Sequence, residues 1–252
     1  MIEREDRDAV TIVRMARGKG NALNVELLAA ISQVLDEIER SAIRAAVITG
    51  QGSVFGAGVD LTELIQGGPQ YVRRFIPQMV DVFKRLATFP KPLVAAVNGH
   101  AIAGGAILML ACDQRLLARG PARLGLAEIQ VGVLFPAWAL EIARFATPPE
   151  HFPTLICTGR TWQGEEALTR GLVDELVDAD DLLDRACQVA SEMGAIPTAT
   201  FAATKQAVRR PLVETAERQA KLTDAAVIED WCSSETLARV AAFAERSIKR
   251  RA

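Results

Sequence analysis

The chain has 252 residues, half of them hydrophobic, and a formal net charge of −2. This length suits one large domain, or a domain with an appendage, and the apolar fraction is ample for a buried core. The small net charge predicts no nucleic-acid partner and no attraction to an anionic membrane, and no apolar run reaches the roughly 20 residues that cross a bilayer. The charged N-terminus lacks the apolar centre of a signal peptide, so we expect a cytoplasmic protein.

Cysteine and histidine are sparse in this sequence. The four cysteines are scattered without a C-x-x-C pair, and the two histidines lie far apart. This spacing argues against a zinc site or disulfides and fits a reducing compartment. We therefore predict no metal site.

The first half of the chain predicts alternating strands and helices, which is typical of an α/β fold with at least part of the sheet parallel. Asn24 stands where it can cap the first helix. Apolar runs and turns predict strands at 2–5, 9–15, 45–49, 93–97 and 114–118. Helical spacing predicts helices at 25–40, 60–65 and 71–87, with a break at 67–69 and a kink at Pro77.

From residue 138 the pattern becomes helical and alanine is frequent, with one strand at 175–177. Helices are expected at 138–145, 151–158, 164–170, 180–193, 197–209 and 212–247. We divide the chain into a core over 1–195, helix-rich from about 138, and a C-terminal helical region over 196–252.

The stretch 98–113, N-G-H-A-I-A-G-G-A-I-L-M-L-A-C-D, is the most informative part of the sequence. Gly104 and Gly105 open a predicted helix that is apolar on every side and therefore buried. Glycine weakens a helix but permits close approach to the first-turn amides, which have no internal partner and carry partial positive charge. The N–H of Gly104 is thus a candidate donor to an anionic oxygen. Alternatively, the glycines only let the helix pack tightly against a sheet.

A second glycine loop, 50–59, follows another buried strand. Its spacing is not G-x-G-x-x-G, so a dinucleotide site is not supported. Asp60, at its end, can cap the next helix. Two such loops facing one another would direct two main-chain amides at one carbonyl oxygen, as an oxyanion hole does.

Three motifs in order resemble the signatures of the crotonase (enoyl-CoA hydratase/isomerase) superfamily. They are F-G-A-G-V-D-L, N-G-x-A-x-A-G-G and, at 125–132, G-L-A-E-I-Q-V-G. The similarity runs from Ile12 to about Val208 and is strongest to the mitochondrial-type Δ3,Δ2-enoyl-CoA isomerases. It implies a crotonase-like spiral of β-β-α repeats whose C-terminal helices build a homotrimer or a dimer of trimers. It also implies an acyl-CoA thioester substrate, with coenzyme A as part of that substrate and no other cofactor.

The resemblance implies that the N–H groups of Val59 and Gly104 form the oxyanion hole and that Glu128 is the catalytic acid and base. Glu128 lies in a mostly apolar stretch, so we expect burial to raise its pKa toward neutrality. Such a pKa suits proton transfer near neutral pH. From the residues alone, a surface glutamate at a strand edge is an equal alternative.

Hydratases of the superfamily use a second glutamate, and the matching position here is Ile107. Isoleucine can neither accept a proton nor hold an activated water. We therefore predict that the enzyme shifts the double bond of a 3-enoyl-CoA to the 2-trans position through a dienolate, with a dry wall from Ile107, Phe135 and Trp138. Enoyl-CoA hydration (a lyase reaction), decarboxylation, thioester hydrolysis and a non-enzymatic acyl-CoA-binding scaffold stay open.

The other binding residues also follow from the resemblance. Ala22 and Leu23 would line the adenosine end of coenzyme A, and Lys205 would lie near the nucleotide phosphates. For Ala22 and Leu23 the alternative is a plain helix-entry loop. For Lys205 it is a solvent-facing side chain, and for Asp60 it is a helix cap. The expected substrate contacts are completed by Ala57, Gly58, Asp60, Leu61 and Gly105.

Overall fold

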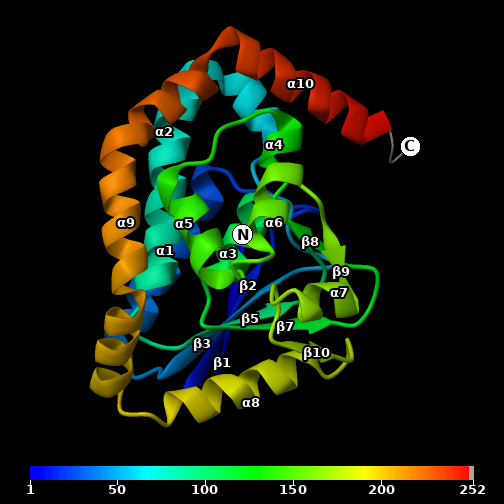
Figure 1. Cartoon of the computed structure of the whole chain (residues 1–252). Helices are drawn as coiled ribbons and strands as arrows, with labels where there is room; N and C mark the ends of the chain where they lie inside the picture. Colours follow the sequence, from blue (N-terminus) through cyan, green and yellow to red (C-terminus); the bar gives the residue numbers. More distant parts are fainter. Residues whose placement is uncertain (250–252) are drawn as a thin grey trace.

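The structure is a computed structural model that describes residues 1–249, and it contains two sheets surrounded by helices (Figure 1). The larger sheet has the order β1-β2-β3-β5-β7-β10. Its strands are β1 (Ile2–Arg7), β2 (Val10–Met15), β3 (Ala45–Gly50), β5 (Leu93–Val97), β7 (Gln114–Ala118) and β10 (Glu175–Val177). The pair β1–β2 is antiparallel and the other neighbours are parallel, so the predicted α/β fold is confirmed.

The smaller sheet has the order β4-β6-β8-β9, and the sequence did not predict it. Its strands are β4 (Val54–Gly56), β6 (His100–Ile102), β8 (Arg123–Gly125) and β9 (Trp162–Gln163). The first three are parallel and β9 is antiparallel to β8. Strands of two or three residues are too short to show a periodic pattern in the sequence. These segments were therefore predicted as loops, and only one strand was predicted after residue 138.

Helices cover both faces of the larger sheet, which explains why β3 and β5 are buried along their whole length. Helix α8 crosses one face, and α1, α2 and α3 lie on the other (Figure 1). The helices are α1 (Val25–Arg40), α2 (Leu61–Thr88), α3 (Gly104–Leu110), α4 (Glu128–Val131), α5 (Ala137–Ala146), α6 (Phe152–Thr158), α7 (Gly164–Thr169), α8 (Leu182–Gly194), α9 (Thr198–Cys232) and α10 (Ser234–Lys249). Asn24 Oδ1 accepts the N–H of Leu27 at 2.9 Å, which confirms the predicted cap.

Helix α2 is interrupted at Gly68, where φ is +56° and ψ is −151°. The predicted break at 67–69 is therefore confirmed. At Pro77 the backbone keeps helical dihedral angles, and the predicted kink there stays a prediction. Ile76 and Met79, on either side of Pro77, are buried and pack into the core.

Helix α9 is continuous through Pro211, so the two helices predicted at 197–209 and 212–247 are wrong. Packing along α2 and α5 sustains the helix despite the hydrogen bond that proline cannot make. The break lies instead at Ser233, whose Oγ accepts the N–H of Thr236 at 3.1 Å and begins α10.

The boundary predicted at 195 falls between α8 and α9, and the division into two regions stays a prediction. Residues 250–252 of the C-terminal region lie outside the described part of the chain. Within residues 1–249, none of the helices combines the length and hydrophobicity needed to span a bilayer.

Candidate active site

The small sheet gathers the three predicted catalytic residues at one edge. The parallel strands β4, β6 and β8 lie side by side, and Val59, Gly104 and Glu128 each follow the carboxyl end of one of them. Loops at the carboxyl ends of parallel strands meet at the same edge of a sheet, a common place for ligand sites.

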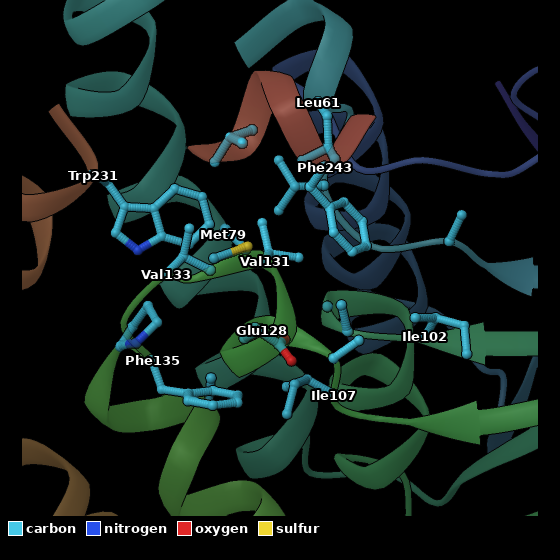
Figure 2. Close-up of a pocket in the computed structure, with 18 of the residues that line it drawn as sticks. Leu61, Met79, Ile102, Ile107, Glu128, Val131, Val133, Phe135, Trp231 and Phe243 are labelled. Carbon is cyan, nitrogen blue, oxygen red and sulfur yellow. The ribbon is translucent and has the colours of Figure 1, made fainter. Parts of the chain in front are cut away.

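A mostly apolar cavity opens at this edge of the small sheet. Val59, Gly104 and Glu128 all line it. Among the described lining residues, Glu128 is the only ionisable one. Figure 2 shows its side chain surrounded by apolar groups, including Leu61, Met79, Ile102, Val131, Val133 and Phe243.

The N–H of Val59 is directed by a short parallel bridge to Leu23. Leu23 donates to the carbonyl of Gly58 at 2.7 Å and accepts from the N–H of Asp60 at 2.9 Å. Successive amides of an extended chain point to opposite sides, so the N–H of Val59 points away from Leu23. A Cβ on Gly58, where φ is +83°, would lie 2.9 Å from the Cβ of Ala103, so the two glycine loops are in direct contact.

The N–H of Gly104 is directed by a strained residue before it. Ala103 has φ +53° and ψ −129°, a conformation that costs a non-glycine residue about 1–3 kcal/mol. Its N–H donates to the carbonyl of Gly125 at 2.8 Å, and its carbonyl accepts the N–H of Ala106 at 2.8 Å. Gly104 is the first residue of α3, so its own N–H has no intrahelical acceptor. An alanine in this conformation carries no signal in the sequence.

Gly105 serves packing. A Cβ there would lie 2.1 Å from the carbonyl oxygen of Gly56 in β4, so the helix touches the small sheet backbone to backbone. The alternative of tight packing therefore holds for Gly105, which is absent from the cavity lining, while Gly104 lines the cavity.

Glu128 is the first residue of the one-turn helix α4 and only 9% exposed. The alternative of a surface glutamate at a strand edge is therefore wrong. Its Oε2 is buried and has no hydrogen-bond partner among the described residues. Burial raises the pKa of Glu128 to about 8, as its apolar setting predicts.

Seven of the predicted site residues line the cavity: Ala57, Val59, Leu61, Gly104, Ile107, Glu128 and Phe135. Trp138 does not; it is buried beneath Lys84, and the indole in the cavity wall is that of Trp231, from α9. Sequence reasoning missed Trp231 because it lies about a hundred residues beyond the nearest motif.

Other predicted binding residues support the site from behind. Leu23 is fully buried, and its side chain packs beneath Gly104. Ala22 accepts a hydrogen bond from Arg17 at 3.0 Å through its carbonyl. Asp60 caps α2 by accepting the N–H of Glu63 at 3.1 Å, and it pairs with Arg17 at 2.8 Å. The cap alternative thus holds for Asp60.

Lys205 is neither solvent-facing nor at the cavity. It is 7% exposed, and its Nζ lies 2.8 Å from Oδ2 of Asp113, whose Oδ1 lies 2.8 Å from Nη2 of Arg209. Burial lowers the pKa of Lys205 to about 8. The expected contact between the Lys205 ammonium group and the nucleotide phosphates does not agree with this position, because the ammonium group is buried and already paired with the Asp113 carboxylate.

The family model described as enoyl-CoA hydratase/isomerase matches residues 5–249. The chain belongs to this family. It is 31% identical over 212 residues to the short-chain-enoyl-CoA hydratase of Clostridium acetobutylicum, covering 83% of this chain and 80% of the relative. It is 28% identical over 222 residues to the mitochondrial enoyl-CoA delta isomerase 1 of Mus musculus, covering 87% of this chain and 77% of the mouse protein.

The solved structure of human mitochondrial delta3-delta2-enoyl-CoA isomerase superposes on the whole chain. The TM-score is 0.92 at 26% identity, covering 100% of this chain and 99% of the human one. The crotonase fold is therefore confirmed, and the protein is an enzyme of the enoyl-CoA hydratase/isomerase class.

Proposed function

We propose that this protein is a Δ3,Δ2-enoyl-CoA isomerase, which moves the double bond of a 3-enoyl-CoA to the 2-trans position. The observation that supports this choice is the single carboxyl group in an otherwise apolar cavity. Hydration needs a group that holds and activates water, and Ile107 in the cavity wall cannot do so. A lone carboxylate suffices to move one proton from one carbon to another.

In the proposed reaction, the Glu128 carboxylate takes a proton from C2 of the substrate. The electron pair of that C–H bond moves toward the thioester carbonyl, and the product of this step is a dienolate. The N–H groups of Val59 and Gly104 stabilise its oxygen; one such donor is typically worth about 10²–10³ in rate. Glu128 then returns the proton to C4, and the double bond is left between C2 and C3.

The apolar walls support the same chemistry. Glu128 has a pKa of about 8, so it both accepts and releases a proton readily near neutral pH. Ile107 and Phe135 line the cavity together with Val131 and Val133. Such walls exclude water that would otherwise react with the dienolate or protonate it at the wrong carbon.

The test mixes purified protein with a 3-enoyl-CoA and follows the ultraviolet absorbance of the conjugated 2-enoyl thioester. Absorbance should rise, and mass spectrometry should find no addition of water. Formation of a 3-hydroxyacyl-CoA from 2-enoyl-CoA, without isomerisation, would establish the alternative, an enoyl-CoA hydratase. A folded protein that binds coenzyme A but turns over neither thioester would contradict both reactions.

We further propose that the enzyme is a homotrimer or a dimer of trimers, that it acts in the cytoplasm and that it needs no cofactor besides the coenzyme A of its substrate. Light scattering on the purified protein tests the assembly, because a trimer and a hexamer differ twofold in mass. The mass of a monomer would contradict the proposed trimer and hexamer.

A further inference from the structure

The connector between α4 and α5, residues 132–136, shapes the cavity without regular secondary structure for most of its length. Val133, Phe135 and Pro136 line the cavity, and Glu128 lies one helical turn before the connector. A one-turn helix and an irregular segment have few hydrogen bonds of their own. Tertiary contacts must therefore hold Glu128 in place.

The two ends of the connector are held by the C-terminal helices. At its start, Arg239 of α10 donates from Nε to the carbonyl of Gly132 at 3.3 Å. Just beyond its end, Asp224 of α9 accepts the N–H of Ala137 through Oδ1 at 2.9 Å.

The middle of the connector is held by Trp231 of α9. Its indole Nε1 donates to the carbonyl of Leu134 at 2.9 Å, and the ring, only 3% exposed, lines the cavity. In Figure 2, Trp231, Val133 and Phe135 lie on one side of Glu128 and Ile102 lies on the other. A buried indole has one donor, and here that donor is used on the chain segment that follows the proposed acid–base group.

We propose that Trp231 is a positioning residue: its hydrogen bond to Leu134 holds the connector so that Glu128 and Phe135 stay in their working positions around the substrate. The inference rests on the proposed isomerase function. It assigns α9 a direct part in the geometry of the active site, since the indole N–H acts on the connector and through it on Glu128.

The test compares Trp231→Phe with Trp162→Phe in the full-length protein. Trp162 is fully buried in β9, it is not part of the cavity lining, and its Nε1 has no acceptor among the described residues. Trp231→Phe thus removes an indole N–H that donates to Leu134, whereas Trp162→Phe removes an indole N–H that has no acceptor among the described residues. Both variants lose part of a buried ring, so a lower melting temperature is common to both.

In Trp231→Phe we expect kcat for 3-enoyl-CoA to fall about 10- to 100-fold, because a displacement of about 1 Å at a reacting group costs up to about 10² in rate. KM should stay within about threefold, since neither glycine loop is touched. In Trp162→Phe kcat should stay within about twofold. An unchanged kcat in Trp231→Phe, or equal losses of kcat in the two variants, would overturn the assignment.

Hydrogen–deuterium exchange across 132–137 tests the contact without catalysis. Exchange should accelerate in Trp231→Phe and not in Trp162→Phe; unchanged exchange overturns the proposal. Accelerated exchange in a protein that lacks isomerase activity would uphold the positioning contact and reject the proposed function instead. If Trp231→Phe does not fold, the exchange of the Trp231 indole N–H in the unmodified protein, followed by NMR, tests the same hydrogen bond: slow exchange is expected, and rapid exchange would overturn the proposal.

Discussion

The cavity is lined by one buried carboxyl group among the described residues, that of Glu128. Burying Glu128 without a partner penalises its ionised form, which raises its pKa from 4.5 to about 8. Between these values the folded chain keeps a proton that the unfolded chain has lost. The free energy of unfolding therefore falls as the pH rises through this window, so the burial of this carboxyl group lowers the stability of the protein.

Substituting Glu128 by glutamine should abolish isomerisation while the protein still binds the thioester. Glutamine keeps the shape of the side chain but cannot accept a proton. We expect a loss of at least about 10³-fold in kcat, measured by absorbance, with acyl-CoA binding retained in calorimetry. Glu141→Gln is the matched control, because Glu141 is buried in α5 outside the cavity lining and pairs with Arg144. Full activity in Glu128→Gln would rule out the proposed acid and base.

The pH dependence of the rate should report the same carboxyl group. The reaction begins with the ionised form, which is scarce in the free enzyme below about pH 8. We expect kcat/KM to rise about tenfold per pH unit below this midpoint and to level off above it. Initial rates between pH 5 and 9.5, restricted to conditions where circular dichroism is unchanged, measure the profile. A plateau already reached at pH 5.5 would contradict a buried base.

Among the secondary-structure elements, the close contact of α3 with the small sheet sets the position of one proposed oxyanion donor. Gly105 and Gly56 meet backbone to backbone, and Gly104 enters the cavity beside that contact. The strained conformation of Ala103 persists because hydrogen bonds to β8 and within α3 hold it from both sides.

Replacing Gly105 by alanine should separate α3 from β4. The new Cβ would lie 2.1 Å from a main-chain oxygen that has no side-chain freedom to yield. We expect the free energy of unfolding to fall by about 1–3 kcal/mol in urea titrations, with a loss of kcat as the N–H of Gly104 shifts. In the control Gly20→Ala, the nearest atom to the new Cβ is the Ala57 Cβ at 3.5 Å, an ordinary contact. Equal free energies of unfolding in the two variants would show that α3 and β4 can move apart at the Gly105–Gly56 contact without loss of stability.

Across the whole molecule, Arg209 of α9 joins the helical C-terminal region to the sheet core. It donates at 2.7 Å to the carbonyls of Ala87 and Ala111, which lie at the ends of α2 and α3, and it pairs with Asp113. Because a guanidinium is donor-only and planar, one side chain satisfies several carbonyl groups that those helix ends leave unpaired.

Truncating Arg209 to alanine should destabilise the fold strongly. The change leaves buried carbonyl groups without donors and breaks a buried ion pair, so we expect a loss of about 3–5 kcal/mol in the free energy of unfolding. The neighbouring Arg210 is exposed, and Arg210→Ala should change this free energy by less than about 0.5 kcal/mol. Chemical denaturation of both variants measures the difference, and similar midpoints would contradict this role of Arg209.

Local patterns sufficed for much of this protein. Continuous apolar runs marked β3 and β5, helical spacing marked α1, and Asn24 and Asp60 were recognisable as caps. The two glycine loops and the apolar surroundings of Glu128 pointed to the cavity, because the polarity of neighbours in sequence already determines how costly ionisation is. Pro211 wrongly suggested a helix break, because packing of α9 along α2 and α5 outweighed the local preference of proline.

Three-dimensional packing decided what no local pattern could. The strands of the small sheet are too short to be periodic, yet their pairing brings Val59, Gly104 and Glu128 to one edge. Trp231 reaches the cavity, and Lys205 is held by Asp113, only because α9 folds back across the core. Such contacts join residues about a hundred positions apart, and their free energy comes from burial and pairing that exist only once the chain has folded.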